Sequence, residues 1–142
     1  FDRIRHAIES YIPSNARSQL MEIGSNAVIL DAYNANPNSM QAALENFSKH
    51  AAKNKIIMLG AMMELGIDSI KEHQQIIEQI QTLNFQQVIL VGGDFKNTNH
   101  PFHFFNQVED ACSWLKNHQP ENSTILIKGS RSMKMEKLVD VL

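Results

Sequence analysis

The sequence contains only one cysteine, Cys112, among 142 residues. A single cysteine excludes an internal disulfide framework and a zinc site built from cysteines, and it fits a reducing, cytoplasmic setting. Long apolar runs are also missing. Runs such as residues 55–60 and 88–91 are far shorter than the roughly 18 residues that a membrane-spanning helix needs. We therefore expect neither a disulfide-stabilised scaffold nor a membrane protein.

An excess of positive charge is absent as well. Lys and Arg total 13, Asp and Glu total 15, and the formal net charge is −2. A nucleic-acid-binding domain normally shows a basic surface, and a polybasic membrane anchor needs clustered cations, so we expect neither kind of partner. Hydrophobic residues make up 43% and charged residues 20% of the chain, which is typical of one globular domain with a core.

Several motifs that carry nucleotide or hydrolase chemistry are missing. The chain has no G-x-x-x-x-G-K-[ST] phosphate-binding loop and no G-x-G-x-x-G dinucleotide fingerprint, and it has no G-x-S-x-G nucleophile elbow. The six histidines are scattered without partners at metal-ligand spacing, so we predict no metal site. The chain opens on Phe1 in a charged helical pattern, which favours a piece of a longer protein.

What is present is an alternation of short apolar strands and amphipathic helices. The helix over residues 40–51 is marked by an apolar stripe at i, i+3, i+4 and i+7, with Asn38 or Ser39 as its cap. The pattern predicts an α/β sandwich with a mostly parallel sheet in a single domain. Strands are expected at residues 20–23, 27–31, 56–60, 88–93, 103–105 and 124–129, and helices at 2–11, 40–51, 70–83, 108–118 and 133–142.

Polar segments follow four of these strands, at residues 31–39, 60–66, 92–96 and 128–131. Parallel strands end at the same edge of a sheet, where ligands bind in such folds. We therefore place the candidate site at this edge.

Two stretches at this edge carry candidate chemistry. In DAYNANPNS, Asp31 can accept hydrogen bonds from ribose hydroxyls, and Asn34 and Asn36 can donate and accept; a turn rich in Asn for backbone reasons is an equal alternative. In KGSRSMKME, three cations and two hydroxyls near a helix start favour an external carboxylate or phosphate over a merely solvated end.

Cys112 is interpreted as a core residue, and His73 as a structural residue ahead of a functional one.

The stretches DAYNANPNSMQAAL, LGAMMELG followed by His73, and KGSRSMKME together resemble the C-terminal domain of the Mur ligases, in the form that joins D-alanyl-D-alanine to UDP-N-acetylmuramoyl-tripeptide. The resemblance runs from about Tyr11 to Leu142. It implies that residues 1–142 form a Rossmann-like three-layer domain, with residues 1–12 as a helix from a central ATP-binding domain. That central domain would carry the phosphate-binding loop and the Mg²⁺ ligands, so this chain alone would be inactive.

The resemblance also implies a reaction and roles. ATP would phosphorylate the tripeptide carboxylate, and the amine of D-alanyl-D-alanine would attack the acyl phosphate, in peptidoglycan precursor synthesis. The residues that match the family pattern are Arg17 at the ATP γ-phosphate, Asp31, Asn34 and Asn36 at the nucleotide, and Lys128, Ser130 and Arg131 facing the dipeptide.

Two positions depart from the family pattern: Ala16 stands where a Gly is usual, and Ala61 where an Asp is common. The roles of Ala61 and His73 stay open. A free-standing Rossmann-like nucleotide or small-anion binding module is the alternative function. A third function, an α/β hydrolase or transferase active in its own right, is the weakest alternative, because the sequence shows no pairing of a base with a nucleophile.

Overall fold

The computed structural model describes residues 18–142, so the expected helix at 2–11 and Arg17 lie outside the described residues. One six-stranded sheet runs in the order β1-β2-β6-β3-β4-β5. Only the β1–β2 pairing is antiparallel among the described strands, which confirms the mostly parallel sheet. The strands are β1 (Gln19–Ile23), β2 (Asn26–Asp31), β3 (Lys55–Gly60), β4 (Gln87–Val91), β5 (His103–Phe105) and β6 (Thr124–Lys128).

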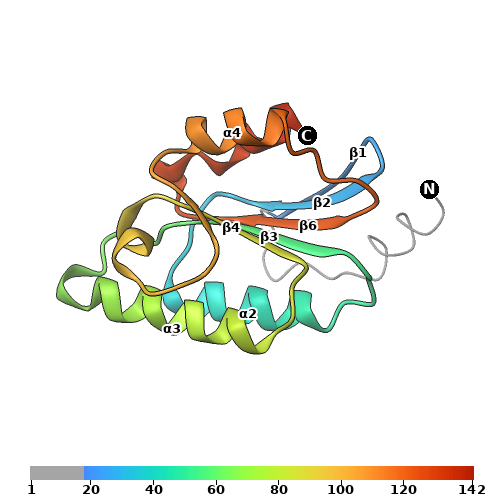
Figure 1. Cartoon of the computed structure of the whole chain (residues 1–142). Helices are drawn as coiled ribbons and strands as arrows, with labels where there is room; N and C mark the ends of the chain where they lie inside the picture. The colour runs from blue at the N-terminus through green and yellow to red at the C-terminus, as the bar shows by residue number, and fades with distance from the viewer. Residues whose placement is uncertain (1–17) are drawn as a thin grey trace.

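Helical segments cover both faces of the sheet, as Figure 1 shows. Two α-helices pack on one face, and one α-helix with a 3-10 segment packs on the other. The first face carries α2 (Pro37–Ser48) and α3 (Ser69–Thr82), and the second carries α4 (Val108–Lys116) and η4 (Met135–Val141). The predicted three-layer architecture is therefore confirmed. Among residues 18–142, no helix combines the length and the apolar content needed to cross a membrane.

The core consists of two apolar clusters, one on each side of the sheet. Alternate residues of a strand point to opposite faces, and β3 follows this rule. Ile57 and Leu59 pack with the α2 and α3 side chains, while Ile56 and Met58 pack with those of α4 and η4. The continuous apolar run of β3 is thus explained by burial on both faces.

The ends of α2 differ from the sequence expectation. The N-cap is Asn36, not Asn38 or Ser39, because Pro37 occupies the first turn and the Asn36 side chain accepts the Ser39 N–H. The helix ends at Ser48, and Ala51 is exposed beyond it. The predicted helix was therefore too long at its C-terminal end.

The helix predicted at residues 133–142 was wrong. Two 3-10 segments, η3 (Arg131–Met133) and η4, occupy this region, and Lys134 between them has a left-handed backbone with φ 54°. A left-handed residue interrupts the repeating α-helical hydrogen bonds. Two further 3-10 segments, η1 (Gly66–Asp68) and η2 (Gly93–Asn97), lie in the loops after β3 and β4.

Candidate functional site

The carboxyl ends of β2, β6, β3 and β4 lie next to one another, because these four strands are consecutive and parallel. The polar segments that follow them form one edge, called here the rim: residues 31–39, 60–66, 92–96 and 128–131. Asp31 and Lys128 are register partners at the ends of β2 and β6. The sequence prediction of a shared edge is confirmed.

The centre of the rim is a buried ion pair. Lys128 Nζ lies 2.8 Å from Asp31 Oδ2, and the two side chains are only 1% and 4% exposed. The same ammonium donates to the backbone carbonyl of Asn34, at 3.2 Å. Moving two charges out of water is costly, and a close pair with additional hydrogen bonds offsets that cost. The pair therefore ties the 31–39 segment to the end of β6.

Asn34 and Asn36, two of the three asparagines of the 31–39 segment, are exposed, and their side chains contact the local backbone. Asn34 Oδ1 accepts the Ala35 N–H at 2.9 Å. Asn36 Oδ1 accepts the Ser39 N–H at 2.9 Å, and the Asn36 N–H donates to Ser39 Oγ at 3.0 Å. This reciprocal arrangement is a capping box, so Asn36 fixes the start of α2 whatever else it binds.

The 128–131 segment passes close to the end of β3. A Cβ added to Gly129 would lie 2.8 Å from the Gly60 Cα, so only glycine fits this close approach. The next residue, Ser130, is 6% exposed, and its N–H donates to the Ala61 carbonyl at 3.2 Å. Its hydroxyl lies 3.2 Å from that of Ser132.

Arg131 is the exposed member of the two cations predicted to face a substrate. Its guanidinium carbon lies 5.5 Å from the ring centroid of Tyr33, a cation–π distance. Arg131 and Tyr33 come from the two stretches that the sequence singled out, so the rim brings those stretches into contact. By contrast, the ammonium of Lys128 is turned inward to Asp31.

His73 on α3 contacts the rim segment 60–66, and the sequence predicted only a structural role for it. It is completely buried, its ring edge packs on Phe95 at a centroid distance of 4.7 Å, and Nε2 accepts the Met62 N–H at 3.0 Å. Burial lowers its pKa, while the carbonyl of Ser69 and the charges of Asp94 and Glu72 act in the opposite direction. One signal was available: His73 lies three and four positions before Ile76 and Ile77, on the buried stripe of α3.

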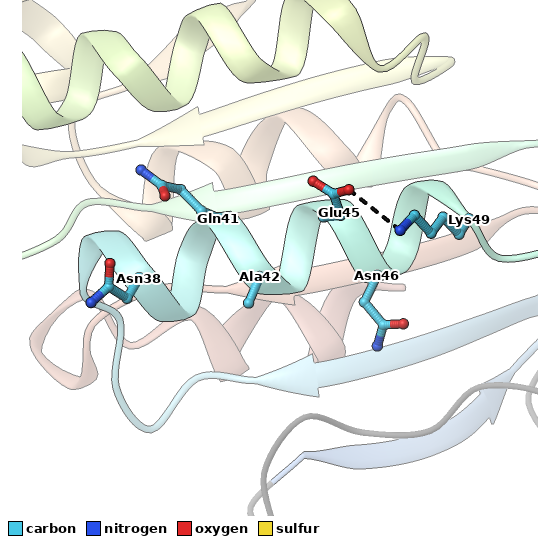
Figure 2. A pocket seen from close by; sticks show the side chains of 6 residues that line it. All are labelled: Asn38, Gln41, Ala42, Glu45, Asn46 and Lys49. Atoms are coloured by element: carbon cyan, nitrogen blue, oxygen red, sulfur yellow. Dashed lines mark ion pairs between the residues drawn. The ribbon is translucent and has the colours of Figure 1, made fainter.

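Two surface hollows lie near these segments. Figure 2 shows the first, on the outward face of α2, where Glu45 and Lys49 form an exposed ion pair at 3.4 Å. It contains none of the predicted site residues. The second, of about 230 Å³, lies beside η3 and is lined partly by Asn106, Ser132 and Lys134.

No group of three or more His, Cys, Asp or Glu side chains in residues 18–142 lies close enough together to hold a metal ion. Cys112 is half-buried, and burial raises the pKa of its thiol. A raised pKa reduces the thiolate fraction that nucleophilic chemistry requires.

A family model described as Mur ligase, glutamate ligase domain, matches residues 16–131. The chain belongs to this family. The UDP-N-acetylmuramoyl-tripeptide–D-alanyl-D-alanine ligase of Rickettsia prowazekii is 35% identical over 133 residues, which cover 89% of this chain and 30% of that protein. The corresponding ligase of Bacillus subtilis is 31% identical over 123 residues, covering 80% of this chain and 27% of that protein.

Solved structures of Mur ligases share the fold. A crystal structure of MurF from Acinetobacter baumannii is 27% identical with a TM-score of 0.73, covering 94% of this chain and 32% of that one. The MurF ligase of Thermotoga maritima in complex with ADP has a TM-score of 0.75 at 21% identity, covering 93% of this chain and 31% of that one. This Mur ligase chain thus spans 27–32% of the length of the four proteins named here.

Proposed function

We propose that this chain is the C-terminal domain of an ATP-dependent ligase that joins D-alanyl-D-alanine to UDP-N-acetylmuramoyl-tripeptide. The reaction transfers the γ-phosphoryl group of ATP to the tripeptide carboxylate. The dipeptide amine then attacks the acyl carbon, forms the amide bond and releases phosphate. The product is a peptidoglycan precursor, and we place the enzyme in the cytoplasm.

One observation carries the proposal: the rim joins the two stretches that resemble the ligase pattern. Asp31 and Lys128 pair across β2 and β6, and Arg131 lies over Tyr33. The relatives from Rickettsia and Bacillus bear the name of this activity, and the ADP bound to the Thermotoga ligase supports the use of ATP.

The proposed roles of Arg131, Ser130 and Lys128 follow the positions of their side chains. Arg131 is exposed and carries a planar donor fork, which suits the unreactive carboxylate of the dipeptide. Ser130, the neighbouring residue, would support Arg131 in binding the dipeptide. The Lys128 ammonium is paired with Asp31, so Lys128 would contact the dipeptide only if that pair separated and would otherwise hold the two segments together. The roles of Asp31, Asn34 and Asn36 at the nucleotide and of Arg17 at the γ-phosphate rest on the family resemblance. Arg17 lies outside the described residues, and Asp31 is buried in its pair with Lys128.

The rim is half of a site in this proposal. The chain lacks a phosphate-binding loop. We therefore assign the phosphate cradle and the Mg²⁺ ligands to the rest of the ligase, which would close the site over this rim.

The test uses the full-length ligase with Arg131→Ala. Truncating one partner of a desolvated charge pair costs about 2–5 kcal/mol, and 1.4 kcal/mol is a factor of ten. The KM for D-alanyl-D-alanine should rise at least about 25-fold while the KM for ATP changes little. Lys49→Ala, which removes an exposed cation at the C-cap of α2, is the matched control. An unchanged dipeptide KM with a lowered melting temperature would make Arg131 structural.

A calorimetric titration of the isolated chain with ATP distinguishes the ligase domain from a free-standing nucleotide-binding module. The isolated chain should bind ATP weakly, because the phosphate cradle lies elsewhere. Sub-micromolar ATP binding by residues 1–142 alone would favour a free-standing nucleotide-binding module instead.

A further inference from the structure

His73 joins two segments through both nitrogens of its ring. Nδ1 lies 2.7 Å from the Ser69 carbonyl, and Nε2 lies 3.0 Å from the Met62 amide nitrogen. A carbonyl oxygen only accepts and a backbone N–H only donates, so Nδ1 carries the proton and Nε2 is bare. The surroundings therefore require a neutral imidazole in one tautomer.

The Met62 N–H belongs to the same peptide group as the Ala61 carbonyl. That carbonyl accepts the Ser130 N–H at 3.2 Å, and the Ala61 N–H donates to the Val91 carbonyl at 3.0 Å. A continuous series of hydrogen bonds thus leads from Ser69 on α3, through the imidazole and one peptide group, to the backbone of Ser130. Hydrogen bonds in such a series strengthen one another in a buried setting.

We propose that His73 is a positioning residue, which holds the turn containing Ser130 and Arg131 at its working position through the Ala61–Met62 peptide group. The functional part of this inference rests on the proposed function of the rim. The contacts themselves are independent of it. His73 touches no proposed substrate group directly, and its effect passes through the backbone.

The surroundings of His73 decide its charge state. Phe95 packs against the ring and keeps it from water, while Asp94 on η2 and Glu72 on α3 are the charged groups that act on it within the described residues. A proton on Nε2 would oppose the Met62 N–H, donor against donor. The peptide group would then have to rotate, and Ser130 would lose its acceptor.

The first experiment is NMR on this chain, without any variant. A through-hydrogen-bond coupling between the Met62 amide nitrogen and His73 Nε2 is expected. As the pH is lowered, the Met62 and Ser130 amide signals should shift with the midpoint of the His73 ring. A Ser130 amide that does not respond to the protonation of His73 overturns the proposal.

The second experiment compares substitutions at His73. His73→Leu removes the acceptor, and we expect hydrogen exchange at the Ser130 amide to accelerate at least about tenfold. His73→Gln can still present an oxygen near the Nε2 position and should restore most of the protection. His118→Gln is the matched control, because His118, just beyond the end of α4, contacts the Trp114 carbonyl at 2.8 Å in the same i to i−4 spacing but is exposed.

The third experiment places the same variants in the full-length ligase. A displacement of about 1 Å can cost a hundredfold in rate, so His73→Leu should lower kcat/KM for the dipeptide about ten- to a hundredfold, with a smaller change in the KM for ATP. His73→Gln should recover activity and lose the acid limb of the pH profile. Equal loss for both substrates overturns the positioning role. A wild-type ligase without this activity refutes the proposed function and leaves the NMR result standing.

Discussion

The buried pair of Asp31 and Lys128 leads to a sharp prediction on stability. Lys128→Met removes the cation and leaves a carboxylate that is 4% exposed. Breaking one side of a buried pair costs about 3–5 kcal/mol, because the remaining charge stays buried and loses the ammonium 2.8 Å away. The Asn34 carbonyl loses a donor in the same step. Since native domains have only about 5–15 kcal/mol of stability, the variant should be strongly destabilised.

The informative comparison is a double-mutant cycle. Asp31→Leu should also be strongly destabilising, because it leaves a buried ammonium. Combining Asp31→Leu with Lys128→Met removes both charges, and replacing a buried pair by apolar residues of similar volume is often neutral or stabilising. The double variant should therefore be more stable than either single variant.

The assays are urea unfolding and thermal unfolding at pH 7, both followed by the fluorescence of Trp114, the one tryptophan of the chain. A stability change of 1 kcal/mol corresponds to a melting shift of about 2–4 °C for a chain near this size. The single variants should therefore melt roughly 6–20 °C lower. Additive losses in the double variant, or a loss below about 1 kcal/mol for Lys128→Met, would refute the view that the two charges are mutually dependent.

Three further outcomes are expected. Burial lowers the pKa of His73, so the unfolded chain binds a proton at this residue at higher pH than the folded chain does. The free energy of unfolding should therefore fall as the pH drops below about 6.5. The same dependence of stability on pH in His73→Gln would contradict this. Asn36→Ala should cost about 0.5–2 kcal/mol by removing the cap of α2, and an unchanged urea midpoint would show that the cap is dispensable. Gly129→Ala should cost about 1–3 kcal/mol, because its Cβ would meet the Gly60 Cα at 2.8 Å; wild-type stability in that variant would mean that the two strands separate easily.

The sequence predicted the layered fold well because its strands are continuous apolar runs. The run at β6, for example, is buried along its whole length, and such a pattern indicates a central parallel strand. The segment after it was not predictable in the same way. Met135 and Leu138 are buried at a helical spacing, but the left-handed Lys134 divides the segment into 3-10 turns.

The sequence predicted the edge that the candidate residues share, but not that Asp31 and Lys128 pair with each other. Asp31 and Lys128 were both expected at the rim, each facing a ligand. Ninety-seven positions separate them in the sequence, and only the adjacency of β2 and β6 reveals that each charge has the other as a partner. His73 was missed as a bridge for a related reason: its acceptor role depends on a backbone N–H at Met62, which residue identities do not encode.

The strand order has a consequence for how the chain folds. β6, the last strand in the sequence, lies between β2 and β3 at the middle of the sheet. During synthesis from the N-terminus, the first strands therefore appear without the neighbour that joins them, and the sheet closes only when residues 124–128 have been made. Contacts between distant parts of a chain slow folding, and unpaired strand edges invite aggregation. A nascent chain that stops before β6 would lack the strand linking its two halves, so the fold should be acquired late and all at once.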